Sequence, residues 1–146
     1  MKIGHRHYHT IWLNPDGRSV DIIDQRWLPH EFRVVTLETV DDVATAIRDM
    51  WVRGAPLIGV TAAYGVATAM AGDASNAALD QVWEKLHETR PTAINLKWAL
   101  DDMRGFLRGL PEARRQEAAY ARAAAIAEED VLLNRAIGGH GLSVIK

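Results

Sequence analysis

Two short segments of this chain combine an arginine with the start of a predicted helix. In the first, Arg53-Gly54-Ala55 comes directly before Pro56, and in the second, Arg90 comes before Pro91 and Thr92. Glycine and alanine allow a ligand to approach the backbone closely, and the free N–H groups at a helix start attract anions. The forked arginine guanidinium suits a phosphate. If the fold brings both segments together, they predict a phosphate site.

A simpler interpretation of the same segments needs no ligand. Proline is common in the first turn of a helix, because its missing N–H would have no partner there. Thr92 can serve only to cap the helix that follows it. Spacing alone does not decide between the two interpretations.

Other residues give weaker signals for chemistry. His5, His7 and His9 alternate and would share one face of a strand, but no carboxylate or cysteine accompanies them, so we expect no metal site. The run Gly138-Gly139-His140-Gly141 superficially resembles a phosphate loop, yet it follows a predicted helix rather than a strand, so we expect a helix end there. We identify no Ser-His-Asp arrangement and assign no catalytic residue.

Composition narrows the class of protein. With 146 residues, 48% of them hydrophobic and 25% charged, the chain fits one soluble globular domain. Its 17 Lys and Arg against 19 Asp and Glu give a net charge of −2, which argues against a general nucleic-acid binder. The absence of cysteine excludes a disulfide scaffold, a thiolate metal site and a cysteine nucleophile within these residues.

The hydrophobic pattern predicts no membrane segment. The most apolar stretch, residues 55–71, is interrupted by Thr, Gly and Tyr, and the N-terminus lacks the apolar core of a signal peptide. We therefore expect a cytoplasmic protein that does not act at a membrane.

The first forty residues favour strands. Residues 8–13 and 19–24 predict a hairpin around the turn Asn14-Pro15-Asp16-Gly17, in which Pro presets φ and Gly accepts a positive φ. Residues 33–38 predict a third strand.

Helices follow, and each has a start signal or an apolar face. Thr39 is placed to cap the first one, and Pro56 opens one that is apolar nearly all round and should lie in the core. The predicted helices cover residues 40–51, 56–70, 76–87, 93–107 and 111–137, and the apolar residues 142–145 predict the start of a strand.

Several long motifs resemble one family. The run from Arg53 to Gly65, RGAPLIGVTAAYG, resembles the signature of the S-methyl-5-thioribose-1-phosphate isomerases, and Thr89 to Leu96, TRPTAINL, resembles that family's second marker. Four further segments match the family in the same order along the chain: TIWL (residues 10–13), IIDQ (22–25), LP (28–29) and NRAIG (134–138). The resemblance therefore covers essentially the whole chain.

The resemblance implies a reaction. Members of that family convert 5-methylthioribose 1-phosphate to 5-methylthioribulose 1-phosphate in methionine salvage, by ring opening followed by transfer of a proton or hydride from C2. No redox cofactor and no metal are implied. Substrate contacts carry over to Arg53, Gly54, Ala55 and Arg90, in an anchoring and charge-stabilising role rather than in proton transfer.

Family members are much longer than this chain, which implies that it is only a part. They continue into a Rossmann-like C-terminal domain that carries a catalytic Cys and Asp, and the parent proteins are expected to be homodimers. The resemblance predicts an N-terminal domain, inactive alone, of α+β class and predominantly helical. A small antiparallel β element (residues 1–38) packs on a helical bundle (39–141), and residues 142–146 begin the missing C-terminal domain.

Two relatives of that family leave alternatives. Regulatory subunits of a translation-initiation exchange factor suggest a non-catalytic interaction module that depends on a protein partner. Ribose-1,5-bisphosphate isomerases suggest another substrate, whose second phosphate needs cations where a methylthio group needs an apolar pocket. The Arg53-Gly54-Ala55-Pro56 form favours the methylthioribose branch.

Overall fold

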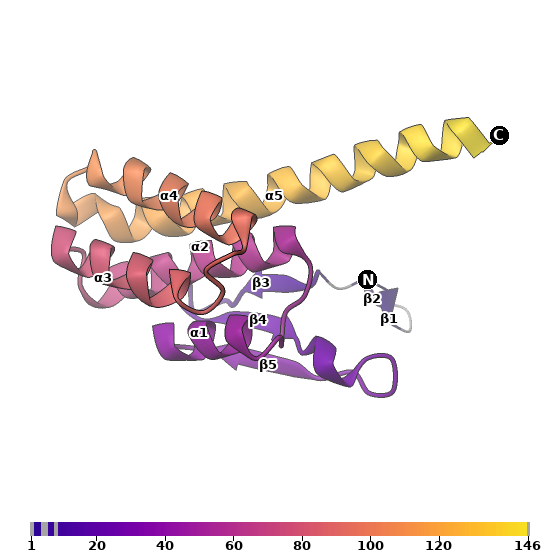
Figure 1. Ribbon diagram of the computed structural model, residues 1–146, viewed down its shortest axis with the longest axis horizontal. Coiled ribbons are helices and arrows are strands. Elements are labelled where there is room, and N and C mark those ends of the chain that lie inside the picture. The colour runs from indigo at the N-terminus through magenta and orange to yellow at the C-terminus, as the bar shows by residue number, and fades with distance from the viewer. Residues whose placement is uncertain (1, 4–5, 8, 146) are drawn as a thin grey trace.

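The computed structural model describes residues 2–3, 6–7 and 9–145. A small antiparallel sheet and α1 form one side of the molecule, α2 lies in the middle, and α4 and α5 lie on the other side (Figure 1). The helices are α1 (Val40–Arg48), α2 (Ala55–Gly72), α3 (Asn76–His87), α4 (Ile94–Arg108) and α5 (Glu112–Ile145). The strands are β1 (Lys2–Ile3), β2 (Arg6–His7), β3 (Ile11–Leu13), β4 (Val20–Ile23) and β5 (Val34–Leu37), and η1 (Gln25–Trp27) is a short 3-10 helix. The predicted α+β class with a predominance of helix is confirmed.

The predicted hairpin and third strand form one sheet in the order β3-β4-β5, antiparallel throughout. The turn between β3 and β4 is held by Asp16, whose carboxylate accepts hydrogen bonds from the backbone N–H groups of Arg18 and Ser19. Gly17 takes a positive φ of 73° there, as its place in the turn predicts. Val20 and Ile22 of the central strand are buried in the core.

The core is built around α2, which packs against α1, α3, α4 and α5. All residues from 57 to 67 are buried, so this part of the helix is covered on every side, as its uniformly apolar sequence predicts. Two glycines allow close packing. A Cβ on Gly65 would lie 2.8 Å from both Val43 Cγ1 and Leu86 Cδ1, and a Cβ on Gly59 would lie 3.1 Å from the Asn95 carbonyl oxygen.

By length and composition alone, α2 could also cross a membrane, which differs from the expectation that no segment could. In this fold 67% of that segment is buried inside the protein, and core helices of soluble proteins pass the same test. The expectation that the protein does not act at a membrane stays a prediction.

The predicted cap of the first helix is confirmed. The Thr39 side chain accepts a hydrogen bond from the Asp42 N–H while the Asp42 carboxylate accepts one from the Thr39 N–H, which completes a capping box on α1. Helix α3 is capped by Ser75, which sequence analysis did not single out: its hydroxyl accepts a hydrogen bond from the Ala78 N–H at 3.1 Å. The far end of α1 is shorter than predicted, because Met50 takes a φ of 62° and turns the chain away after Arg48.

Two predictions near the C-terminal end are wrong. Helix α5 continues through residues 138–141 instead of ending there, and residues 142–145 are helical instead of forming a strand. A strand needs a neighbour to pair its backbone groups, and among the described residues no strand lies beside this segment. A helix makes those hydrogen bonds within itself, and the exposed glycines lower helix propensity without preventing the helix.

An ion pair, a cation–π contact and a backbone hydrogen bond connect the end of the sheet to the turn between α1 and α2. Asp24, only 1% exposed, accepts a bidentate pair of hydrogen bonds from Arg26, at 3.0 and 2.7 Å. The Arg26 guanidinium lies 4.7 Å from the ring centroid of Trp51, and the Gln25 N–H donates to the Trp51 carbonyl oxygen at 2.9 Å. The backbone just before Arg53 is therefore held by the β element.

We expect Gly65→Ala to lower the free energy of unfolding by about 1–3 kcal/mol, because the new methyl group must displace two buried side chains. Val43 is β-branched and has little freedom to move away. Urea denaturation measures the change. The matched control is Gly105→Ala at an exposed position of α4. No atom lies within 4 Å of the added methyl there, and a gain of about 0.5–1 kcal/mol is expected. A Gly65→Ala protein as stable as the parent would contradict this packing.

We expect Asp24→Asn to lower the free energy of unfolding by about 1.5 kcal/mol near pH 7. The Arg26 guanidinium holds the pKa of the Asp24 carboxyl below its usual range, so the stabilisation is complete above the unfolded-state pKa. This stabilisation is lost as the carboxylate protonates below about pH 4. The difference in free energy of unfolding between the parent and the Asp24→Asn protein should therefore fall towards zero at low pH. Thermal unfolding from pH 2.5 to 7 measures it.

Glu31→Gln is the control for that series. Glu31 pairs with Arg33 at 2.9 Å in the same part of the chain, but both side chains are exposed. Such a pair contributes about 0–1 kcal/mol. A pH-independent loss on Asp24→Asn would contradict a role for the Asp24 charge.

Candidate functional site

The four predicted binding residues line one pocket of about 280 Å³. Arg53, Gly54 and Ala55 come from the start of α2, and Arg90 comes from the turn before α4. The structure thus brings together the two arginine segments that are separate in the sequence.

Close packing of α2 against α4 creates this pocket. Gly59, in the second turn of α2, faces the backbone of Asn95 in the first turn of α4. Any side chain at position 59 would push against the Asn95 carbonyl oxygen, and a backbone atom cannot rotate away as a flexible side chain can. The glycine in the first motif therefore keeps the two helix starts close together.

Both helix starts are open. The α2 start at Gly54 and the α4 start at Ala93 make no side-chain capping hydrogen bond with any described residue, whereas α1 and α3 are capped by Thr39 and Ser75. Their first backbone N–H groups have no partner within the helix, and the positive ends of the helix dipoles lie at the same place. The idea that Thr92 caps α4 is wrong, because a turn from Arg90 to Ala93 delays the helix by one residue.

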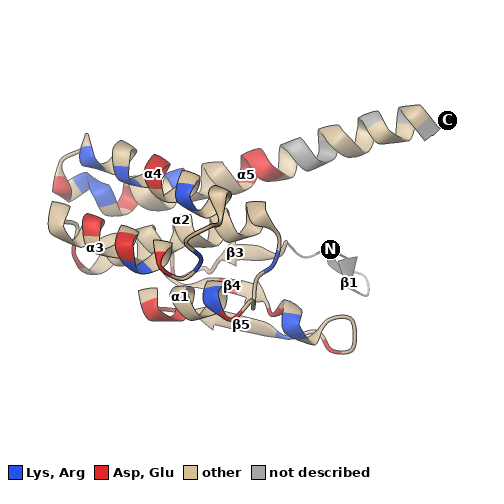
Figure 2. Cartoon of the chain, in the orientation of Figure 1, with Lys and Arg blue, Asp and Glu red and all other residues tan. Residues whose placement is uncertain are grey.

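The arginines of the pocket lack acidic partners. Within the described part of the chain, neither Arg53 nor Arg90 forms an ion pair, and no Asp or Glu lines the pocket. Elsewhere charges of both signs are interspersed over the helices other than α2 (Figure 2), and Arg122, for example, pairs with Asp102 at 2.8 Å. Two unpaired guanidinium groups beside two open helix starts make a local positive site that suits a phosphate.

The backbone conformation at Gly54 also belongs to this site. Its φ of 91° is one that side chains rarely adopt, while no atom lies within 4 Å of the position of a Cβ. Glycine is thus required here by the turn into α2 and not by crowding. The open space above it leaves the start of α2 accessible to a ligand.

The rest of the pocket lining is mostly apolar. Besides Asn95 it consists of Met50, Ile58, Ala93, Ile94 and Leu96. Ile94 is 82% exposed and Met50 is 42% exposed, which is unusual for large apolar side chains. Sequence analysis did not find these residues, because nothing in their spacing links residue 50 to residue 94.

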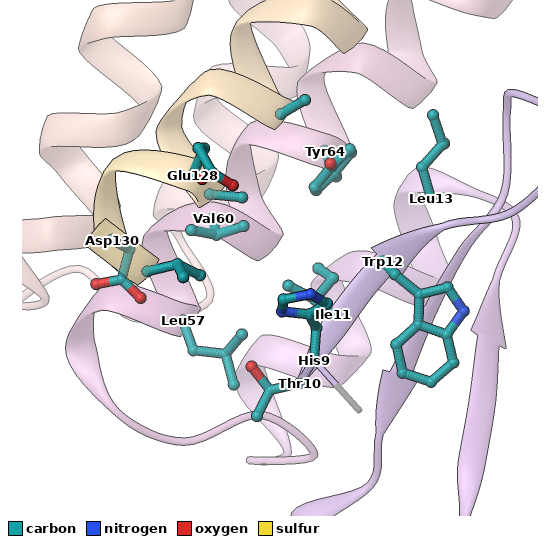
Figure 3. Close-up of a pocket in the computed structure, with 13 residues that line it drawn as sticks. His9, Thr10, Ile11, Trp12, Leu13, Leu57, Val60, Tyr64, Glu128 and Asp130 are labelled. Carbon is teal, nitrogen blue, oxygen red and sulfur yellow. The ribbon is translucent and has the colours of Figure 1, made fainter. Parts of the chain in front are cut away.

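A second pocket, of about 240 Å³, lies between β3 with the two residues before it, α2 and α5 (Figure 3). Its walls carry His9, Tyr64, Glu128 and Asp130. Burial raises the pKa of the Tyr64 hydroxyl, so this group stays protonated at neutral pH. Two carboxylates make this pocket unsuitable for a phosphate, and sequence analysis did not single it out.

The predicted absence of a metal site is not tested at the alternating histidines. His5 lies outside the described residues, and the side chain of His7 is not described either. Within the described residues, no group of three or more His, Asp and Glu side chains is placed to hold a metal ion.

Comparison with known proteins finds relatives whose sequences match this chain over its whole length. It is 80% identical to the methylthioribose-1-phosphate isomerase of Brucella anthropi and 55% identical to that of Escherichia coli, over all 146 residues in both cases. The chain spans about 40% of the length of these relatives. The resemblance predicted from the two arginine motifs is confirmed.

Solved structures agree with the fold. The 5-methylthioribose 1-phosphate isomerase from Pyrococcus horikoshii matches with a TM-score of 0.75 at 37% identity, over 84% of this chain and 36% of that one. Subunit delta of the translation initiation factor eIF-2B from A. fulgidus matches with the same TM-score at 32% identity, over 84% of this chain and 37% of that one. A family model also matches residues 51–146, a range that includes both arginine segments. The chain belongs to the Initiation factor 2 subunit family.

Proposed function

We propose that this chain is the substrate-anchoring part of an isomerase that converts 5-methylthioribose 1-phosphate to 5-methylthioribulose 1-phosphate. The observation that carries the proposal is the single pocket in which two open helix starts meet two unpaired arginines. The names of the relatives over the whole chain supply the reaction.

In this proposal the phosphate of the substrate lies between Arg53 and Arg90. The backbone N–H groups at the starts of α2 and α4 donate to its oxygens, and the guanidinium groups balance its charge. In this proposal the arginines and the backbone N–H groups hold the sugar in one orientation, so they bind and orient the substrate but move no proton. Proton or hydride transfer between C2 and C1 then requires groups outside this chain, which would make the chain inactive alone.

Location and assembly complete the proposal. We infer a cytoplasmic protein that works as a homodimer with a C-terminal domain beyond these residues, and that needs neither metal nor redox cofactor.

A second candidate function is a non-catalytic interaction module. The match to subunit delta of an initiation factor, at the same TM-score as the isomerase, favours keeping it as an alternative. Such a module would bind a protein partner and would have no use for a phosphate site. The isomerase is favoured because the relatives found over the full chain, at up to 80% identity, carry that name.

The test uses the protein as its gene encodes it. We expect Arg53→Gln and Arg90→Gln each to weaken binding of 5-methylthioribose 1-phosphate about 10- to 100-fold, because each removes charged hydrogen bonds worth about 1.5–3 kcal/mol. Calorimetric titration gives the dissociation constants, and a coupled assay gives isomerase activity.

Arg114→Gln is the matched control, because Arg114 is an exposed arginine on α5 and does not line this pocket. It should leave binding unchanged. Absence of isomerase activity together with absence of sugar-phosphate binding in the parent protein would favour the interaction module instead.

A further inference from the structure

The backbone at Met50 is in a conformation that normally belongs to glycine. Its φ is 62°, and among the described residues it is the only non-glycine at positive φ. It follows the end of α1, where the Trp51 N–H donates to the Ala46 carbonyl oxygen and the Met50 N–H donates to that of Ile47. In this type of helix ending, glycine is preferred because a Cβ is strained there.

The Met50 side chain does not offset that strain by burial in the core. It is 42% exposed, whereas the core methionines Met70 and Met103 are buried. It lies instead on the wall of the pocket that holds Arg53 and Arg90. Strain kept at the edge of a binding pocket suggests that the side chain serves the ligand.

The pocket offers a ligand two kinds of contact. Arg53 and the helix starts suit an anion, whereas Met50, Ile58 and Ile94 offer only carbon and sulfur atoms. A second phosphate placed against these three side chains would lose its hydration without gaining a partner. A thioether loses little on leaving water and contacts a flexible methionine well.

We propose that Met50 is a specificity-determining residue, whose side chain contacts the methylthio group of the substrate while the phosphate lies against Arg53 and Arg90. This inference rests on the proposed function, since it takes the substrate from it. Met50 would thus select a 5-methylthio sugar phosphate over sugar phosphates with a hydroxyl or a phosphate at that carbon.

The experiment compares 5-methylthioribose 1-phosphate with ribose 1-phosphate, which has a hydroxyl in place of the methylthio group. Dissociation constants are measured by calorimetry on the protein as its gene encodes it. We expect Met50→Ala to weaken binding of the methylthio compound about 10-fold and to leave ribose 1-phosphate unchanged. Met50→Leu keeps an apolar side chain of similar volume and should retain most of the preference.

Met50→Gly separates a role in binding from a role in folding. Glycine accepts the positive φ, so this variant should unfold at a higher temperature than the parent while losing the same preference for the methylthio compound. If Met50 had only a structural role, the Met50→Gly substitution would not raise the stability and lower the preference for the methylthio compound at the same time. The control is Phe106→Ala, a similarly exposed apolar residue (43%) on α4 that does not line the pocket, which should leave both dissociation constants unchanged.

The outcomes distinguish the two proposals. If the parent protein binds both compounds and Met50→Ala leaves their ratio unchanged, the role of Met50 is overturned and the proposed function stands. If the parent protein binds neither compound, both proposals are overturned.

Discussion

The close crossing of α2 and α4 is the contact on which the candidate site depends. Gly59, in the second turn of α2, lets the first turn of α4 approach until a Cβ at position 59 would touch the Asn95 carbonyl oxygen. Two helix starts with positive dipole ends then lie side by side, which would be unfavourable without an anion or water between them. Helices α2 and α4 have no side-chain caps, whereas α1 and α3 have them.

The rest of the structure holds this crossing in place. Helix α2 is surrounded by four other helices, so its start cannot shift without disturbing the core. On the other side, Arg26 and Gln25 fasten Trp51 to the β element, and this fixes the turn that leads to Arg53. The small sheet therefore contributes to the site although none of its strands lines the pocket.

Features that are unusual for a purely structural role gather at this pocket. Met50 is a non-glycine residue at positive φ, two helix starts are uncapped, and two arginines lack a carboxylate partner. The strained backbone and the missing caps cost stability, while the uncapped starts and the arginines suit an anionic ligand. The same turn that strains Met50 also carries Arg53, so charge and apolar surface are presented by one short stretch of backbone.

Local chemistry in the sequence determined the elements with strong signals. The Asn14–Gly17 turn set the hairpin, Thr39 and Ser75 set the starts of two helices, and the two arginine motifs identified the family, because each effect acts within a few residues. Only the tertiary structure decided that Arg53 and Arg90 share a pocket with Met50, since that depends on the packing distance at Gly59. It also decided the state of residues 142–145, because an apolar segment becomes a strand only where another strand pairs with it, and otherwise its backbone hydrogen bonds are made within a helix.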